Sequence, residues 1–186
     1  MDAAPVVTRF APSPTGELHL GNARTALFSL LLARRAAGRF VLRVEDSDAA
    51  RTTPEHVAAL EHDLRWLGLE WDEGPGRSGA HGPYRQSERG GLYAPLLEQL
   101  EREAGAYPCF CSAANLELSR RAQLASGRPP RYAGTCAALD AAQRAARRAA
   151  GARATLRFRI PAGRTLRFDD LVHGPQQVDC AHLGDF

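Results

Sequence analysis

The chain has 186 residues, of which 44% are hydrophobic, so it can bury the core of one domain or of one domain with a modest appendage, and we do not expect disorder. All 24 basic residues are arginine, and the formal net charge is +3. No apolar run approaches the roughly 20 residues of a membrane helix, and no basic stretch precedes an apolar segment at the N-terminus. A membrane protein and a secreted one are thereby excluded, and we expect a cytoplasmic monomer.

The first predicted elements are a short apolar strand near residues 6–10, a stiff loop with two prolines and two glycines, and a helix that begins near Asn22. A loop between the end of a strand and the start of a helix offers backbone N–H groups and the positive end of the helix dipole to phosphate. His19 and Asn22 add side-chain donors there, and Arg9 adds a fixed cation. The segment therefore predicts polyphosphate binding.

A second strand and a second helix follow. The first helix should stop near Gly38, and an apolar strand at 40–44 should end at Glu45. This strand–helix–strand order predicts a parallel pair with a right-handed crossover. The next helix should begin with Thr53 as N-cap and Pro54 in its first turn.

A loop and a third helix are expected next. Residues 72–87 are rich in glycine and proline and predict a long surface loop. Residues 88–103 predict a helix in which Pro95 either makes a kink or marks the first turn. Its inward face should consist of four leucines, namely Leu92, Leu96, Leu97 and Leu100.

The composition changes near Gly105, where cysteines cluster. Helices are predicted at about 113–125 and 140–150, and alternating apolar residues predict a hairpin that turns at 161–163. Residues 105–186 hold 12 arginines against 6 acidic residues, whereas residues 1–104 hold 12 against 15. A basic half favours a phosphate-rich ligand, although arginine enrichment through nucleotide composition is an alternative explanation.

The segment His19-Leu20-Gly21-Asn22 resembles the HIGH signature of class I aminoacyl-tRNA synthetases. The flanking Phe-Ala-Pro-Ser-Pro-Thr-Gly is similar to that of bacterial-type glutamyl-tRNA synthetases. The resemblance implies ATP-dependent ligation of L-glutamate to tRNA, most simply tRNA-Glu, through a glutamyl adenylate. It implies an incomplete Rossmann-like α/β catalytic fold, with residues 1–104 as the first half of the nucleotide-binding domain. Residues 105–186 would be an inserted mixed α/β module that binds the tRNA acceptor end.

The same resemblance assigns residues to two substrates. Arg9 suits the glutamate side-chain carboxylate, because a guanidinium binds carboxylates with two parallel hydrogen bonds. Glu45, at the carboxyl end of a strand, suits the ammonium group. The full expected sets are Arg9, Ala11, Ser13 and Glu45 for glutamate, and Pro12, Thr15, Gly16, His19, Gly21 and Asn22 for ATP, with His19 and Asn22 as the catalytic pair. Magnesium is expected from ATP chemistry, without an identifiable ligand.

The cysteines at 109, 111 and 136 resemble the zinc knuckle of some bacterial glutamyl-tRNA synthetases. Some relatives have a histidine at the position of Ala138. Tyr132 matches a tyrosine that binds zinc in a shorter paralogue, so the expected ligands are Cys109, Cys111, Tyr132 and Cys136. Ordinary buried thiols are the alternative.

Two other functions stay open at this stage. One is that of the shorter paralogue, a glutamyl-Q tRNA(Asp) synthetase, which glutamylates a modified nucleoside. The other is a non-catalytic tRNA-binding fragment, because the chain has no lysine and thus no KMSKS signature for ATP. We expect the chain alone to be poorly active. Arg144, Arg147 and Arg148 share a helical face that either contacts tRNA phosphates or is simply solvated.

Overall fold

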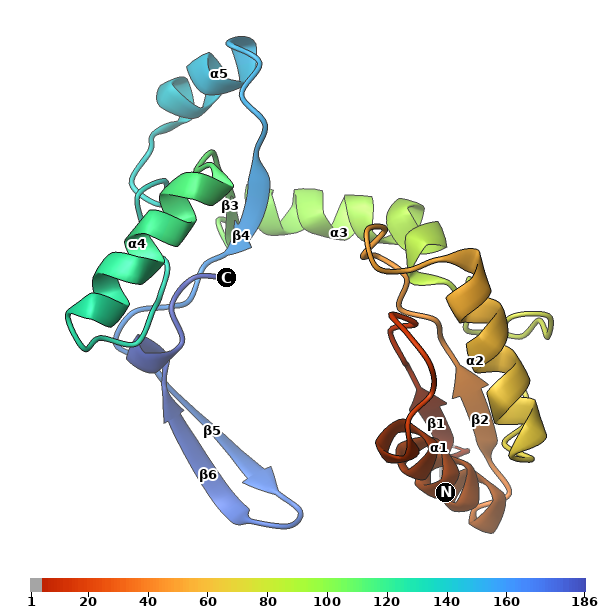
Figure 1. Ribbon diagram of the computed structural model, residues 1–186. Helices are drawn as coiled ribbons and strands as arrows, with labels where there is room; N and C mark the ends of the chain where they lie inside the picture. The colour runs from red at the N-terminus through yellow and green to blue at the C-terminus, as the bar shows by residue number, and fades with distance from the viewer. Residues whose placement is uncertain (1–4) are drawn as a thin grey trace. The chain divides into compact units, whose positions relative to one another are not determined.

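The computed structural model describes residues 5–186. The expectation about a signal peptide therefore falls partly on residues outside the described ones. The elements in chain order are β1 (Val7–Phe10), α1 (Leu20–Arg35), β2 (Arg39–Leu42), α2 (Pro54–Trp66), η1 (Gln86–Arg89), α3 (Gly90–Arg102), β3 (Ala106–Cys109), α4 (Ala113–Ala125), α5 (Ala141–Ala149), β4 (Thr155–Phe158), β5 (Thr165–Asp170), β6 (Gly174–Asp179) and η2 (Cys180–His182) (Figure 1). None of the helices within 5–186 has the length and hydropathy needed to cross a bilayer.

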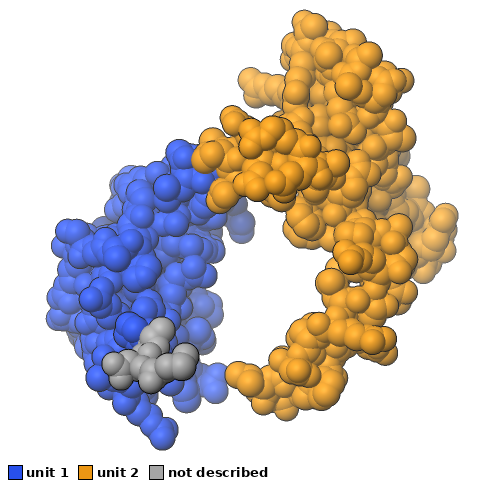
Figure 2. All heavy atoms as spheres, turned by 180° about the vertical axis from the view of Figure 1, so that it is seen from behind, with its two compact units in different colours: residues 1–93 blue, residues 94–186 orange. Residues whose placement is uncertain are grey.

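The chain divides into two compact units, residues 1–93 and residues 94–186 (Figure 2). The division falls inside α3, and so earlier than the domain boundary expected after residue 104. Each unit has its own small sheets and its own buried cluster. The two units are therefore described separately.

The sheet of the first unit is the predicted parallel pair of β1 and β2. Its register sets Arg9 opposite Val41 and Phe10 opposite Leu42. The backbone bonding continues past both strands, since the N–H of Arg43 donates to the carbonyl of Phe10 at 3.0 Å. The N–H of Glu45 likewise donates to the carbonyl of Pro12 at 2.9 Å. The segment after β2 is thereby tied to the loop after β1.

One face of this sheet packs against α1 and α2. The cluster contains strand, helix and loop residues, namely Phe10, Phe40, Leu42, Ala26, Ala33, Leu60, Leu64, Leu69 and Trp71. The start of α2 is as predicted, because the Thr53 hydroxyl accepts the His56 N–H at 3.3 Å and Pro54 opens the helix. Gly68 follows α2 with a φ of 72°, a conformation that glycine adopts without strain.

Helix α3 differs from the expectation in two ways. Pro95 lies well inside it, so it does not mark the first turn. The helix buries no residue among those the structure describes, and Leu92, Leu96 and Leu97 are exposed. The predicted inward face is therefore wrong for these three leucines, whereas the fourth, Leu100, is half-buried.

The second unit pairs its strands differently from the prediction. β4 pairs with β3 in antiparallel register, Ala106 opposite Phe158, and β5 pairs with β6. The predicted hairpin between 156–160 and 166–168 is therefore wrong. The alternation of apolar residues marked β4 and β5 as strands, but their partners depend on contacts that local alternation does not encode. Helices α4 and α5 lie where they were predicted.

The arginines of α5 have partners inside the second unit. Arg148 forms a 2.8 Å ion pair with Glu101 of α3, and the guanidinium of Arg147 lies 5.7 Å from the centre of the Phe110 ring. A capping box between Asp140 and Gln143 starts the helix. Two of the three arginines on this face thus contribute to the packing of their own unit.

Candidate functional site

The loop after β1 leads directly into α1, and His19 is the N-cap residue of that helix. The His19 backbone is extended, with φ −98°, and its carbonyl accepts the N–H groups of Asn22 at 3.0 Å and Ala23 at 3.1 Å. Its imidazole makes no capping hydrogen bond. The side chain is therefore available for a ligand at the positive end of a 16-residue helix.

Gly21 is needed for the position of that imidazole. A Cβ atom at Gly21 would lie 3.1 Å from both Nδ1 and Cε1 of the His19 ring, which is closer than ordinary packing allows. A side chain here would displace the ring by a few tenths of an ångström. At Gly16, in contrast, a Cβ would meet no atom within 4 Å. The protein itself therefore does not require glycine at Gly16.

Arg9 lies on the face of the sheet opposite the core. It lines a cavity of about 710 Å³ together with Arg43 of the neighbouring segment. The remaining lining residues are Val7, Val41, Ala80, His81, Gly82, Tyr84 and Arg89. Residues 11–22 do not line this cavity, so His19 lies at the strand ends and Arg9 lies along the sheet face.

Glu45 is joined to this region by an ion pair that the sequence did not suggest. Arg43 Nη2 contacts Glu45 Oε1 at 2.5 Å, and both residues are half-buried. Arg9 and Arg43 line one cavity, and Arg43 is the partner of Glu45. Glu45 itself does not line the cavity, so its link to the Arg9 region is its ion pair with Arg43, which shares the cavity wall with Arg9. The Pro12–Glu45 backbone bond joins Glu45 to the loop that leads to His19.

Glu73 forms a second polar cluster under the same cavity. The residue is 3% exposed, and its carboxylate binds Arg39 Nη1 at 2.9 Å, His81 Nδ1 at 2.7 Å and the Tyr84 hydroxyl at 2.9 Å. Hydrogen bonds from His81, then from Arg39, lower the pKa of Glu73 to about 2. This cluster fixes the loop that carries His81 and Tyr84, which form part of the cavity wall.

Sequence reasoning missed Glu73 because it begins a stretch rich in glycine and proline, which is typical of exposed loops. The close packing of Gly79 is a partial signal, since a Cβ there would lie 2.3 Å from the Glu73 carboxyl carbon. A glycine required by a neighbouring carboxylate cannot be distinguished from a turn glycine in one sequence.

The predicted metal ligands of the second unit are brought together. The Sγ atoms of Cys109, Cys111 and Cys136 all lie within 4.8 Å of one another. The Tyr132 hydroxyl lies 3.3 Å from Cys109 Sγ and 3.6 Å from Cys111 Sγ, and it accepts the Cys136 N–H at 2.8 Å. Three thiols and one phenol oxygen form a donor set that suits a soft divalent ion such as zinc.

The thiols differ in their acidity. Burial raises the pKa of Cys109, but hydrogen bonds from Tyr132 and Arg157 outweigh burial, and the pKa falls to about 7. Burial raises the pKa of Cys111 above its usual value. Burial, and then the neighbouring Cys109, raise the pKa of Tyr132. Of Cys109 and Cys111, Cys109 is therefore the thiol that more readily supplies a thiolate.

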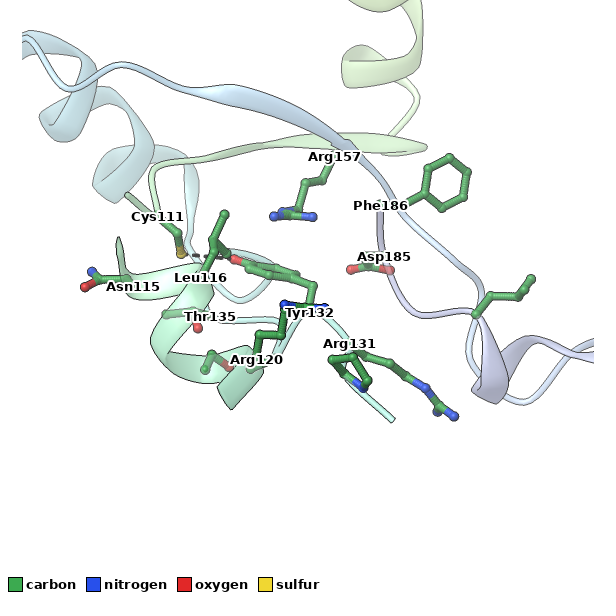
Figure 3. Close-up of a pocket in the computed structure, with 14 residues that line it drawn as sticks. Cys111, Asn115, Leu116, Arg120, Arg131, Tyr132, Thr135, Arg157, Asp185 and Phe186 are labelled. Atoms are coloured by element: carbon green, nitrogen blue, oxygen red, sulfur yellow. Dashed lines mark hydrogen bonds between the residues drawn. The ribbon is translucent and has the colours of Figure 1, made fainter. Parts of the chain in front are cut away.

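A cavity of about 430 Å³ lies beside the cluster (Figure 3). Two members of the cluster, Cys111 and Tyr132, form part of the cavity wall. Three arginines, from α4, from the loop after α4 and from β4, also line it: Arg120, Arg131 and Arg157.

The first unit has the features of a nucleotide-binding α/β protein: a parallel strand pair, and a strand–loop–helix segment at the carboxyl ends of the strands. The family described as tRNA synthetases class I (E and Q), catalytic domain, matches residues 5–186. The chain belongs to this family.

Similar proteins are glutamate–tRNA ligases. The chain is 59% identical to glutamate–tRNA ligase 2 of Alkalilimnicola ehrlichii, over 97% of the chain and 38% of that protein. It is 56% identical to glutamate–tRNA ligase 1 of Halorhodospira halophila, over 100% of the chain and 39% of that protein. A crystal structure of a glutamate tRNA ligase from Elizabethkingia meningosepticum, in complex with its amino acid, has 33% identity and a TM-score of 0.89 over 98% of the chain and 38% of that structure. The chain thus spans well under half the length of these relatives.

Proposed function

We propose that this chain is part of a glutamate–tRNA ligase that activates L-glutamate with ATP and transfers it to tRNA-Glu, as a monomer in the cytoplasm. The observation that supports the proposal is a cavity lined by Arg9 and Arg43, with Glu45 paired to Arg43 and bonded through its backbone to the loop that leads to His19. The ligases that the chain resembles over nearly its whole length support the same substrate class.

In this proposal one side of the site, with Arg9 and Glu45, binds glutamate, and the other side binds ATP. The Arg9 guanidinium holds the side-chain carboxylate of glutamate. Glu45 receives the ammonium group on Oε2, because its Oε1 is engaged by Arg43. The glutamate α-carboxylate is then positioned to attack the α-phosphate of ATP, with pyrophosphate as the leaving group.

The ATP side of the proposed site is the loop and the first turn of α1. The His19 imidazole donates to phosphate oxygens as charge develops on them, and the free N–H groups of the first turn add their dipoles. Asn22, whose own N–H is bound to the His19 carbonyl, contributes its side-chain amide. Magnesium would accompany the ATP phosphates as part of the substrate.

The test of the glutamate site is Arg9→Ala in the full-length protein that carries this chain. Glutamate binding should weaken about 10- to 100-fold, since hydrogen bonds to charged groups contribute about 1.5–3 kcal/mol. ATP-dependent pyrophosphate exchange over a range of glutamate concentrations gives the KM. Arg24→Ala, on the exposed surface of α1, is the control. An unchanged KM for glutamate in Arg9→Ala would reject the carboxylate role.

We propose that residues 105–186 form a module that binds the tRNA acceptor end. The excess of arginine over acidic residues in this part of the chain supports it. The competing function, glutamylation of a modified nucleoside in aspartate tRNA, differs in its acceptor. Charging of tRNA-Glu but not of aspartate tRNA favours the ligase, and the reverse result favours the paralogue.

We propose further that the Cys109, Cys111, Cys136 and Tyr132 cluster holds zinc. The ion would tie β3 to the loop after α4, and the approach of three thiols to within 4.8 Å supports it. Elemental analysis of the purified chain should give about one equivalent of zinc. Less than about half an equivalent after purification without chelator counts against the site.

A further inference from the structure

Arg157 lies beside Cys109 and over the ring of Tyr132. Its guanidinium carbon lies 3.8 Å from the centre of the Tyr132 ring, and Figure 3 shows the guanidinium above that ring, whose hydroxyl points toward Cys111. The buried Nε of Arg157 has no hydrogen-bond partner among the described residues. Arg157 is half-buried, and a partly desolvated cation with an unpaired N–H is stabilised by a neighbouring negative charge.

The proposed metal cluster supplies that charge. Three thiolates around a divalent ion leave one net negative charge, and a phenolate as fourth ligand adds another. Cys109 and Cys136 are buried, so this charge would be costly without a nearby cation. Arginine suits the position because it stays protonated and stacks on aromatic rings.

We infer that Arg157 is a positioning residue of the metal site: it holds the Tyr132 ring against the thiols and offsets the negative charge of the occupied cluster. The inference rests on the metal site proposed above. Arg157 would raise the affinity for the metal and help Tyr132 to serve as a ligand. It would have no part in the formation of the adenylate. Groups that orient metal ligands typically change metal affinity about 10- to 100-fold when removed.

The test compares four forms of the full chain: wild type, Arg157→Met, Arg157→Lys and Arg120→Met. Methionine keeps much of the length and apolar surface of arginine without the charge, and lysine keeps the charge without the planar group. Arg120 lines the same cavity, pairs with Glu117 at 3.7 Å, and changes the net charge equally when replaced. It is therefore the matched control.

Zinc affinity is measured by competition with a chromophoric chelator, and Co²⁺ substitution reports the ligand set through its visible spectrum. Arg157→Met should weaken zinc binding about 10- to 100-fold and alter the Co²⁺ spectrum. Arg157→Lys should recover most of the affinity, and Arg120→Met should match wild type. If Arg157→Met does not fold, Arg157→Gln replaces it.

Three results would overturn the inference. In the first, Arg157→Met binds zinc as tightly as wild type. In the second, Arg157→Lys loses as much affinity as Arg157→Met, so that charge is not responsible. In the third, Arg120→Met loses as much zinc affinity as Arg157→Met, so that the effect comes from the net positive charge around the cavity and not from Arg157 itself. Wild type that binds no metal overturns the zinc proposal and this inference together, while leaving the ligase proposal to the Arg9 test.

Discussion

His19 is the N-cap residue of α1, and its side chain is also the proposed phosphate ligand. Its backbone starts α1 as the N-cap residue, whereas Ser, Thr, Asp and Asn are the residues that usually do so because their side chains cap the helix. The imidazole is left without a capping bond and packs over Gly21. A helix start that gives up a side-chain cap costs some stability, and the gain is a donor placed at the positive end of the dipole.

We predict that His19→Ala in the full-length protein lowers the turnover of adenylate formation about 100-fold or more, with a smaller effect on the KM for glutamate. The reason is that a donor aimed at developing phosphate charge acts mainly in the transition state. Pyrophosphate exchange kinetics measure both quantities. Glu17→Ala, in the same exposed loop, is the control. A variant with normal turnover and weak glutamate binding would contradict this role.

Glu73 should make the stability of the first unit depend on pH. Its pKa of about 2, against an ordinary 4.5, means that the unfolded chain binds its proton more readily than the folded one. The stabilisation is therefore present above pH 4.5 and is lost as the pH falls from 4.5 towards 2. Urea unfolding of Glu73→Gln should show lower stability than wild type at pH 6 and a smaller difference near pH 3.

The control for this pH effect is Glu70→Gln, which removes an exposed ion pair with Arg77 in the same loop region. Exposed pairs contribute little, so its curve should follow wild type. If the free energies of unfolding of Glu73→Gln and wild type differ by the same amount at every pH, the lowered pKa of Glu73 is contradicted.

At the scale of elements, the β5–β6 hairpin should be the least protected sheet. It is two-stranded, most of β5 is exposed, and Leu171 and Val172 at its turn are fully or largely exposed. Such ribbons are marginally stable without a covering layer. Hydrogen–deuterium exchange should therefore be faster for β5 and β6 amides than for the buried residues of β2. Equal protection of the two sheets would show that the hairpin is covered in solution.

The elements that the sequence predicted well carry their signals locally. α2 and α5 begin with the capping residues Thr53 and Asp140, and their ends were predicted closely. β3 has no such signal, because all four residues are buried and one is Pro108, so no alternation marks it. Its pairing with β4 joins residues about 50 positions apart, which only the tertiary fold decides.

The candidate site divides in the same way. The resemblance to a zinc knuckle predicted the ligand set, and the three cysteines do lie close together, because such a motif is recognisable from residue type and spacing. Arg43 and Arg157 were missed, because an arginine beside a carboxylate or an aromatic ring is recognisable only once the fold brings them together. Arg9 and Glu45 were predicted from the family resemblance, and their roles stay predictions until the variants are measured.

At the scale of the whole molecule, the proposed substrate site is open to water. His19 and Arg9 are both exposed, and the sheet of the first unit has only two strands. Water weakens each electrostatic interaction that the reaction needs. We therefore predict that the 186-residue chain exchanges pyrophosphate poorly, even with tRNA present. A complete ligase from a relative, assayed in parallel, is the reference, and comparable rates would contradict this prediction.

The hydrogen bond between the Glu45 N–H and the Pro12 carbonyl has a consequence for enzyme kinetics. It connects the proposed glutamate site directly to the proposed ATP loop. A substitution in the loop after β1, which contains Pro12, would then change the KM values of ATP and glutamate in the same direction. Saturation with one substrate would increase the affinity for the other.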